Sequence, residues 1–258
     1  MPSASPKYGW IHVADWLPAF LGLTLAASVA LVITVWAQEP GFIVAASLCL
    51  TVAVWPLCGF ILSWAKKDTD AWYRGLVEAA VKTGEEKILD VGCGLGRSTV
   101  AVAKALRNGA VIGVDVYSRR ALWGNSLLQA SRNATIEGVE DRTFFRFGDA
   151  SSLPFDAQQF DVVVAAYVTH ELRREQARVA MVQEVFRVLR SGGRFVSGEI
   201  PRSHSTFKRY LWFGFWFLPL AHLEDLRRAA GFVHIRVNQA GRPVIITATK
   251  PRIIGPTH

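Results

Sequence analysis

Hydrophobic positions follow two different patterns along this chain. Near the start there are two long runs without any charge, residues 16–38 and 40–65, which are separated by Glu39-Pro40-Gly41. Each run is as long as the roughly 20 apolar residues that cross a bilayer. The pattern therefore predicts a transmembrane helical hairpin over residues 1–67. A signal peptide and a buried core hairpin are the alternatives; the length of two adjacent runs and the weakly basic start disfavour both.

The basic residues around these runs predict an orientation. Lys66, Lys67 and Arg74 follow the second run, whereas the turn between the runs carries only Glu39. Basic residues gather on the cytoplasmic side of membrane helices. We therefore expect a multi-pass membrane protein with its catalytic domain on the cytoplasmic side.

From residue 68 onward, short buried runs alternate with segments of helical spacing. After a connecting helix at 68–82, this rhythm predicts an α/β domain over residues 68–258: a doubly wound, mostly parallel, seven-stranded Rossmann-like sheet with an antiparallel strand at one edge. The strands are predicted at 87–91, 110–115, 143–147, 160–166, 194–200, 233–238 and 244–249. Helices are predicted at 97–107, 118–136, 175–190 and 223–230. Ser191-Gly192-Gly193 is interpreted as the stop of the third of these helices.

The segment Lys87–Ser98 carries the clearest chemistry. A short apolar run ends in Asp90, and glycine then occupies every second position, at Gly92, Gly94 and Gly96. Glycine lets the backbone approach a ligand closely, and a loop that opens a helix presents free N–H groups. The loop therefore predicts a nucleotide site at the first turn of the domain. The spacing G-x-G-x-G differs from the dinucleotide pattern G-x-G-x-x-G, which disfavours a nicotinamide-dependent oxidoreductase, and no P-loop motif occurs.

Composition limits the remaining function classes. The chain is 51% hydrophobic with a net charge of +8, which fits contact with an anionic membrane surface. No aromatic and basic binding module is recognisable, so nucleic acid is not an expected partner. The three cysteines, Cys49, Cys58 and Cys93, lie in apolar or glycine-loop contexts without metal-ligand spacing, and no metal site is expected.

Five motifs occur in a fixed order: L-D-V-G-C-G-L-G-R, I-G-V-D-V, F-G-D-A-S-S-L-P-F, F-D-V-V-V and E-V-F-R-V-L-R-S-G-G-R-F. In these motifs, over about residues 70–250, the chain resembles the class I S-adenosylmethionine-dependent methyltransferases. The resemblance implies S-adenosyl-L-methionine as the cofactor. It implies cofactor-binding roles for Asp90, Gly92, Cys93, Gly94, Gly96, Asp115, Val116, Asp149, Ala150 and Tyr167.

The same resemblance implies which part of the cofactor each of these residues contacts. Asp90 and the glycine loop hold the methionine part, Asp115 accepts from the ribose hydroxyls, and Asp149 accepts from the adenine amino group. The alternatives are that Asp115 only caps a helix and that Asp149 is only a turn acid. Cys93 as a nucleophile is a weaker alternative.

Catalysis of methyl transfer needs mainly placement, plus a base where the acceptor must lose a proton. Tyr167 and His170, after the fourth predicted strand, are the candidate catalytic residues; Glu171, Glu199, His204 and His222 are further candidates for the base. Imidazole titrates near neutral pH, which favours His170, although a loop histidine that only caps the next helix is an equal alternative.

The insert at 201–222 is dense in aromatic residues, including Phe207 to Phe217. We interpret it as a substrate lid or interfacial helix; covering the sheet is the alternative. The expected function is a membrane-anchored methyltransferase for a lipophilic small acceptor: a quinone or isoprenoid ring, a phospholipid headgroup, or a small thiol or phenol. The rival function is a sensor or scaffold that binds S-adenosylmethionine without turnover.

Overall fold

The chain forms two compact units. The computed structural model describes residues 5–8, 69–118, 122, 124–206, 215, 217–238 and 243–252, with single positions between 22 and 47. The larger unit comprises residues 1–9, 69–201 and 218–258, and the smaller one comprises 10–68 and 202–217. Every described strand belongs to the larger unit.

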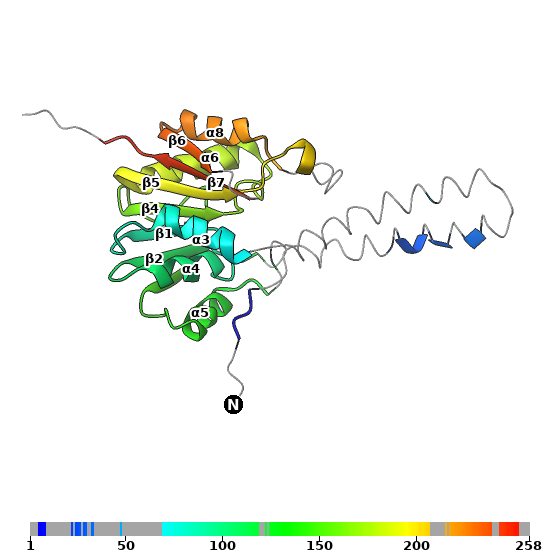
Figure 1. Ribbon diagram of the computed structural model, residues 1–258, viewed down its shortest axis with the longest axis horizontal. Coiled ribbons are helices and arrows are strands. Elements are labelled where there is room, and N and C mark those ends of the chain that lie inside the picture. The colour runs from blue at the N-terminus through cyan, green and yellow to red at the C-terminus, as the bar shows by residue number, and fades with distance from the viewer. Residues whose placement is uncertain are drawn as a thin grey trace, which may run out of the picture. The chain divides into compact units, whose positions relative to one another are not determined.

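The larger unit is built on one seven-stranded sheet. Its strands are β1 (Lys87–Val91), β2 (Ala110–Asp115), β3 (Thr143–Phe147), β4 (Phe160–Ala166), β5 (Leu189–Glu199), β6 (Val233–Asn238) and β7 (Val244–Thr249). Their order is β3-β2-β1-β4-β5-β7-β6, and Figure 1 labels each of these strands except β3. Strands β1 to β5 are parallel, and β7 is antiparallel to both of its neighbours. The mostly parallel, doubly wound sheet is confirmed; the antiparallel strand, predicted at an edge, instead lies between β5 and β6.

Helices cover both faces of this sheet. Helices α3 (Thr69–Ala80), α4 (Arg97–Ala105) and α5 (Leu127–Ile136) share one buried cluster that includes Leu76, Val102 and Ala134. Helices α6 (Glu175–Val188) and α8 (Leu220–Ala229) contribute to the cluster on the opposite face. Because both faces are covered, the central strands β1 and β4 are almost wholly buried, as their unbroken apolar runs require.

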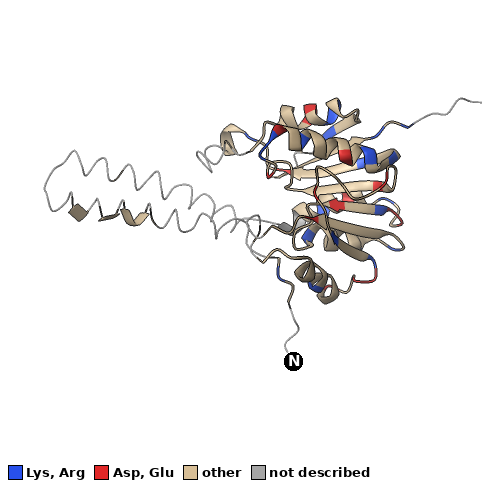
Figure 2. Ribbon diagram, turned by 180° about the vertical axis from the view of Figure 1, so that it is seen from behind, with Lys and Arg blue, Asp and Glu red and all other residues tan. Residues whose placement is uncertain are grey.

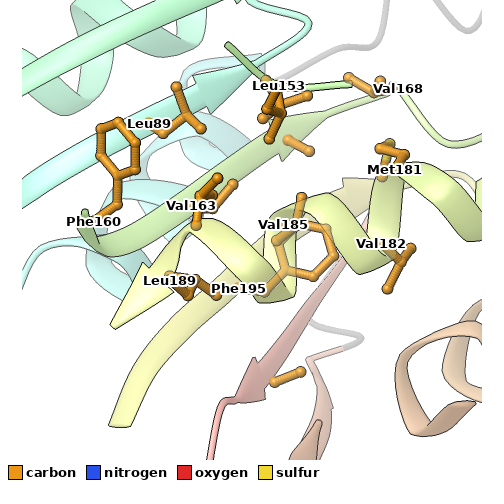
Figure 3. Close-up of a cluster of buried hydrophobic side chains, with 14 of the residues drawn as sticks. Leu89, Leu153, Phe160, Val163, Val168, Met181, Val182, Val185, Leu189 and Phe195 are labelled. Carbon is orange, nitrogen blue, oxygen red and sulfur yellow. The ribbon is translucent and has the colours of Figure 1, made fainter. Parts of the chain in front are cut away.

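The α6 face of the core is closely packed. Met181, Val182 and Val185 recur at helical spacing along α6 and are fully buried. Figure 3 shows them facing Val163 of β4 and Phe195 of β5. Burial of each such side chain contributes on the order of 1.5–3 kcal/mol, so this face anchors β4 and β5 rigidly beneath their carboxyl ends.

Two predicted helix bounds differ from the structure. Helix α5 begins at Leu127, where Ser126 Oγ accepts a hydrogen bond from the Gln129 N–H at 3.2 Å, and not at residue 118. Helix α6 ends at Val188, and Ser191-Gly192-Gly193 lies within β5. Gly192 adopts φ +78°, and the Gly193 carbonyl accepts the Lys250 N–H at 2.8 Å. The glycines therefore permit a bulge in a strand and do not act as the helix stop that was predicted.

The prediction of a multi-pass membrane protein is contradicted. Among the described residues, no helix has both the length and the apolar character needed to cross a bilayer. The predicted hairpin over 1–67 falls outside the described residues, apart from 5–8 and isolated positions. Where helices are described in full they are 9 to 14 residues long, short of the roughly 20 that a span requires, and they pack on the sheet.

Charges of both signs alternate over the helices of the larger unit. Figure 2 shows acidic and basic residues beside one another, and on α8 Arg228 pairs with Glu224 at 2.6 Å and Asp225 at 2.8 Å. Arg119 and Arg120, which contribute to the net charge of +8, lie outside the described residues. The described helices thus carry a mixed surface that does not support a membrane partner.

Candidate functional site

The glycine loop joins β1 to α4 at the carboxyl edge of the sheet. The chain leaves β1 toward β2 on one side and returns through β4 on the other, which makes this edge the switch point where open α/β sheets bind ligands. Gly92, Gly94 and Gly96 have φ values of +69°, +52° and +83°. A Cβ on Gly92 would lie 2.5 Å from Val168 Cγ2 in the loop after β4. The alternate glycines therefore serve both a left-handed turn and close contact with the β4 loop.

Hydrogen bonds hold this loop against the end of β2. The Gly92 and Cys93 N–H groups both donate to the Val114 carbonyl, at 2.8 and 3.2 Å, and the Gly96 N–H donates to the Cys93 carbonyl at 2.8 Å. The Gly94 N–H donates to Asp115 Oδ2 at 2.9 Å. The loop is thus pre-shaped before any ligand binds.

Asp90 is fully buried beneath the loop. Its Oδ2 accepts hydrogen bonds from Ser98 Oγ at 2.7 Å and Thr99 Oγ1 at 2.6 Å, both in the first turn of α4. Its Oδ1 is also buried and has no hydrogen-bond partner among the described residues. Burial raises the pKa of Asp90 to about 6, against the lowering effect of the two hydroxyls. An unpaired buried carboxylate oxygen fits the ammonium group of a methionine moiety.

Asp115 is the last residue of β2. Its carboxylate accepts hydrogen bonds within the protein and can also accept one from a ligand. Its Oδ1 accepts from the Tyr117 N–H and, at 3.3 Å, from Asn125 Nδ2, while Oδ2 accepts from the Gly94 N–H. A carboxylate offers about four acceptor positions, so one on Oδ2 stays available for a ribose hydroxyl. The plain helix-cap alternative does not describe these contacts, because α5 begins twelve residues later, after the Ser126 cap. Val116 follows directly and its side chain is 45% exposed, which leaves it open to an adenine ring.

Cys93 lies inside the loop and is 5% exposed. Its Sγ lies 3.6 Å from Tyr117 Oη. Burial raises the pKa of the thiol, and the negative charges of Asp90 and Asp115 raise it further. Because the thiolate is the nucleophilic form, this cysteine is unsuited to nucleophilic catalysis.

Asp149 and Ala150 follow β3 beside Asp115. The Gly148 N–H donates to the Asp115 carbonyl at 3.1 Å, which brings the ends of β2 and β3 together. Asp149 Oδ1 accepts from the Ser151 N–H at 2.8 Å and from Ser151 Oγ at 2.7 Å, which are the contacts of the turn acid that was the alternative to the predicted adenine contact. Asp149 is exposed, while Ala150 packs against the core.

Tyr167 leaves β4 in a strained conformation, with φ +63°. Its N–H donates to the Gly198 carbonyl of β5 at 2.8 Å. Its ring centroid lies 4.7 Å from that of Trp72 in α3 and 6.5 Å from that of His170. Positive φ in a bulky residue is uncommon and gathers at functional sites, where the surrounding structure enforces it.

Trp72 was not predicted as a site residue. A Cβ on Gly198 would lie 2.0 Å from Trp72 Cζ2, so the indole ring rests directly on the backbone of β5. The glycine at 198 therefore makes room for the ring that packs against Tyr167. The only signal in the sequence was the position of Trp72 on one apolar face of its helix.

His170 lies between two carboxylates. Its Nδ1 is 3.0 Å from Glu199 Oε2, and its Nε2 is 3.4 Å from Glu171 Oε1. Burial alone would lower the pKa of His170, but the hydrogen bonds and charges of Glu171 and Glu199 outweigh it and raise the pKa to about 9. The imidazole is therefore largely protonated at neutral pH. His170 was predicted as a base because imidazole ordinarily titrates near neutral pH. In this structure the two carboxylates raise its pKa above that range.

Glu199 also connects the histidine loop to the sheet. Its Oε1 accepts the Thr169 N–H at 3.1 Å, and its side chain is 1% exposed. The fully buried Arg227 of α8 lies nearby, donating to the Leu223 carbonyl and to Ser197 Oγ, with its guanidinium 4.9 Å from the centre of the Phe195 ring. Burial lowers the pKa of Arg227 to about 10, while the charges of Glu199 and Glu224 oppose that shift. Sequence reasoning missed Arg227, because no local pattern marks a buried arginine.

The other candidate bases are placed differently. His222 Nε2 lies 3.0 Å from Glu175 Oε1 at the surface of α6, and His204 belongs to the smaller unit. Within the part of the chain that the structure describes, no group of three His, Cys, Asp or Glu side chains could hold a metal ion.

Comparison with known proteins identifies a domain that contains the glycine loop. Residues 88–193 match a family model described as a methyltransferase domain. This part of the chain is a methyltransferase domain. The match supports the predicted resemblance to the class I S-adenosylmethionine-dependent methyltransferases, with S-adenosylmethionine as the cofactor.

Curated relatives of this domain are similar over about half their length. The chain is 32% identical to a demethylmenaquinone methyltransferase of Symbiobacterium thermophilum, over 58% of each chain. It is 31% identical to the 27-O-demethylrifamycin SV methyltransferase of Amycolatopsis mediterranei, over 44% of this chain and 38% of that one.

Solved structures share the fold at lower identity. The [4+2]-cyclase SpnF is 22% identical with a TM-score of 0.58, covering 71% of this chain and 82% of that one. The YcgJ protein of Bacillus is 21% identical with a TM-score of 0.54, covering 70% of this chain and 98% of that one. At these identities the likeness establishes the Rossmann-like methyltransferase fold alone.

Proposed function

We propose that this protein transfers the methyl group of S-adenosylmethionine to a lipophilic small molecule that carries a hydroxyl group. The observation that supports it most is the convergence of Asp90, Tyr167 and His170 on one switch point of the sheet. Relatives support the acceptor class: several are named for demethylmenaquinone, a lipophilic quinone, and others for O-methylation of rifamycin SV and erythromycin. Among these, we favour a quinol ring, because three of the relatives with the strongest match are demethylmenaquinone methyltransferases.

For the cofactor, we assign Asp90 Oδ1 to the ammonium group and Asp115 Oδ2 to the ribose. Gly92, Cys93, Gly94 and Gly96 form the floor under the methionine part. Val116, Asp149 and Ala150 are assigned to the adenine side of the site. When bound, S-adenosylmethionine supplies a methyl group already activated on a sulfonium, so placement accounts for most of the acceleration.

For the acceptor, we assign Tyr167 to placement and His170 to the proton. In a quinol, the O–H proton passes to His170, the ring carbon next to that oxygen bonds to the methyl carbon, and the bond from the methyl carbon to sulfur breaks; the ring C–H proton then moves to the oxygen and restores the aromatic ring. In an alcohol, the O–H proton passes to His170 and the oxygen itself forms the bond to the methyl carbon as the bond to sulfur breaks. Because His170 is protonated in the resting protein, only the small deprotonated fraction can take this proton below pH 9. The rate is therefore expected to rise with pH up to about 9. Glu171, with a side chain 34% exposed, is the carboxylate through which the proton leaves.

The test uses the purified full chain and methyl-labelled S-adenosylmethionine. Demethylmenaquinol of short side chain, a macrolide bearing free hydroxyls, and phosphatidylethanolamine vesicles are offered separately. We expect label in the quinol product and S-adenosylhomocysteine in equal amount. Label in the macrolide alone would keep the lipophilic class and reject the quinol.

The second candidate is a sensor or scaffold that binds the cofactor without turnover. One observation favours it: both nitrogens of His170 already have carboxylate partners, which leaves the imidazole without a free acceptor. Calorimetric binding of S-adenosylmethionine together with no labelled product from any of the three acceptors would support this candidate and reject the enzyme proposal.

A further inference from the structure

The first described residues of the chain lie against the helices that border the glycine loop. Residues 5–8, here called the N-terminal strap, run beside α5 (Figure 1). The Lys7 N–H donates to Asn133 Oδ1, and Asn133 Nδ2 donates back to the Lys7 carbonyl, both at 2.8 Å. This reciprocal pair imitates one step of a β-ladder, with a side-chain amide in place of a second strand. The strap and Asn133 belong to the same compact unit although 126 residues separate them.

Asn133 has a second contact, with the glycine loop itself. Its Nδ2 also donates to the Leu95 carbonyl at 2.9 Å, and Leu95 lies between Gly94 and Gly96. Its Oδ1 additionally accepts from Gln129 Nε2 at 3.0 Å. Both donors and both acceptor positions of the amide are therefore used, and the residue is fully buried. The strap thus uses the donor and acceptor positions of Asn133 that Leu95 and Gln129 leave over.

A second set of contacts connects the strap to the same loop. The Tyr8 ring lies 5.6 Å from the guanidinium of Arg97, the residue after Gly96, and Arg97 lies 5.0 Å from the Tyr73 ring of α3 on another side. Tyr8 Oη also donates to Glu137 Oε1 at 3.1 Å, and Glu137 pairs with Lys104 of α4. The strap thus meets the loop at Leu95 through Asn133 and at Arg97 through Tyr8.

We propose that the N-terminal strap supports the glycine loop from outside the cofactor site, and that Asn133 is the positioning residue through which the backbone of the strap fixes the conformation of that loop. The loop must present its backbone to the methionine part of the cofactor in one conformation. Fixing that conformation beforehand removes an ordering cost from binding. The strap therefore raises affinity for the cofactor without touching it. The inference rests on the proposed cofactor site but not on the identity of the acceptor.

The test compares two substitutions at one position of the full chain. Lys7→Pro removes the N–H that donates to Asn133, whereas Lys7→Ala keeps it and removes only the side chain. Affinity for S-adenosylhomocysteine is measured by calorimetry. We expect Lys7→Pro to weaken binding by roughly three- to tenfold, as the loss of one hydrogen bond implies, and Lys7→Ala to leave it unchanged. Equal affinities for the two variants would overturn the proposal.

A double-mutant cycle tests the route through Asn133. In an Asn133→Ala background, Lys7→Pro is expected to have no further effect, because the connection is already cut. An equal effect in both backgrounds would overturn the role of Asn133. Gln129→Ala is the matched control, since Gln129 contacts the same amide oxygen but neither the strap nor the loop.

Hydrogen exchange and thermal melting cover the remaining outcomes. If Asn133→Ala does not fold, hydrogen exchange of the Gly94 and Gly96 amides in the Lys7 pair decides: faster exchange in Lys7→Pro alone supports the proposal, and identical exchange rejects it. A lower Tm for Lys7→Pro with unchanged affinity means a purely structural strap and also rejects it. Failure of the unsubstituted chain to bind S-adenosylhomocysteine would instead reject the assigned cofactor site.

Discussion

His170 Nδ1 and Glu199 Oε2 lie 3.0 Å apart, although 29 residues separate them along the chain. The contact joins the loop after β4 to the end of β5 in a region almost without solvent. It keeps a positive charge on a residue that would otherwise titrate near neutral pH. The chemistry of the site depends on this charge.

The first prediction concerns pH and His170. The pKa rises from 6.5 to about 9 on folding, so the bound proton contributes stability that is fully present below pH 6.5 and is lost as pH rises through 9. We expect the Tm of the unsubstituted protein to decline relative to His170→Gln over this window. Calorimetric melting at pH 6, 7.5 and 9 measures it. A constant difference would mean that His170 is not charged in the folded protein.

Glu199→Gln separates charge from hydrogen bonding at the same contact. The amide can still accept from the Thr169 N–H, but the negative charge facing His170 and Arg227 is gone. Removing one partner from a buried charge cluster costs about 3–5 kcal/mol. We expect a loss of this order in urea unfolding and a lower pKa for His170 by NMR titration. The matched control is Glu171→Gln, whose side chain is more exposed and whose loss should cost much less.

Asp90→Asn should affect cofactor binding and stability in opposite directions. Burial holds the pKa of Asp90 at about 6 in place of 3.8, so its contribution to stability is present below pH 3.8 and lost as pH rises through 6. Above that pH, the neutral amide should match or exceed the carboxyl in stability. Affinity for S-adenosylmethionine should fall roughly 10- to 100-fold, because the ammonium loses its charged partner. Unchanged affinity at pH 7.5, measured by calorimetry, would remove Asp90 from the site.

Asp115→Ala should weaken cofactor binding by about 1–3 kcal/mol, as the ribose hydroxyls lose an acceptor and the Gly94 N–H loses its partner. Asn125→Ala provides the comparison, since it keeps the carboxylate and removes the 3.3 Å contact with Asp115 Oδ1 together with a 3.4 Å contact with the Ser118 carbonyl. Isothermal titration with S-adenosylhomocysteine decides between them. Equal losses in the two variants would assign Asp115 to loop order alone.

Gly198→Ala tests how Trp72 is seated. The added Cβ would lie 2.0 Å from Trp72 Cζ2, so either the indole or β5 must shift, at a cost of roughly 1–3 kcal/mol. In a Trp72→Ala background the same substitution should cost far less. Urea unfolding of the four proteins measures the coupling, and an additive result would contradict the predicted collision.

Much of the fold was predictable because the relevant forces are local. Strands β1, β2, β3, β4, β6 and β7 occur at the predicted bounds; the apolar runs of β1 and β4 are almost wholly buried, whereas β3 and β6 keep several exposed positions. The glycine loop was predictable for the same reason: left-handed turns at Gly92, Gly94 and Gly96 favour glycine whatever surrounds them. Hydropathy alone was less reliable at the start of the chain, where the localisation that it predicted is contradicted by the described helices.

By itself, then, the sequence determined the order of strands and helices along the chain, the glycine loop, and the acids at or next to the last residues of β1 and β2. Only the tertiary structure decided which groups meet at the site. Glu199 sets the charge of His170, Gly198 admits Trp72 beside Tyr167, and Asn133 connects Lys7 to Leu95. Each of these depends on contacts between residues far apart in the chain and on the exclusion of water around them. The hydrophobic periodicity of the sequence contains no information about these long-range contacts or about where water is excluded.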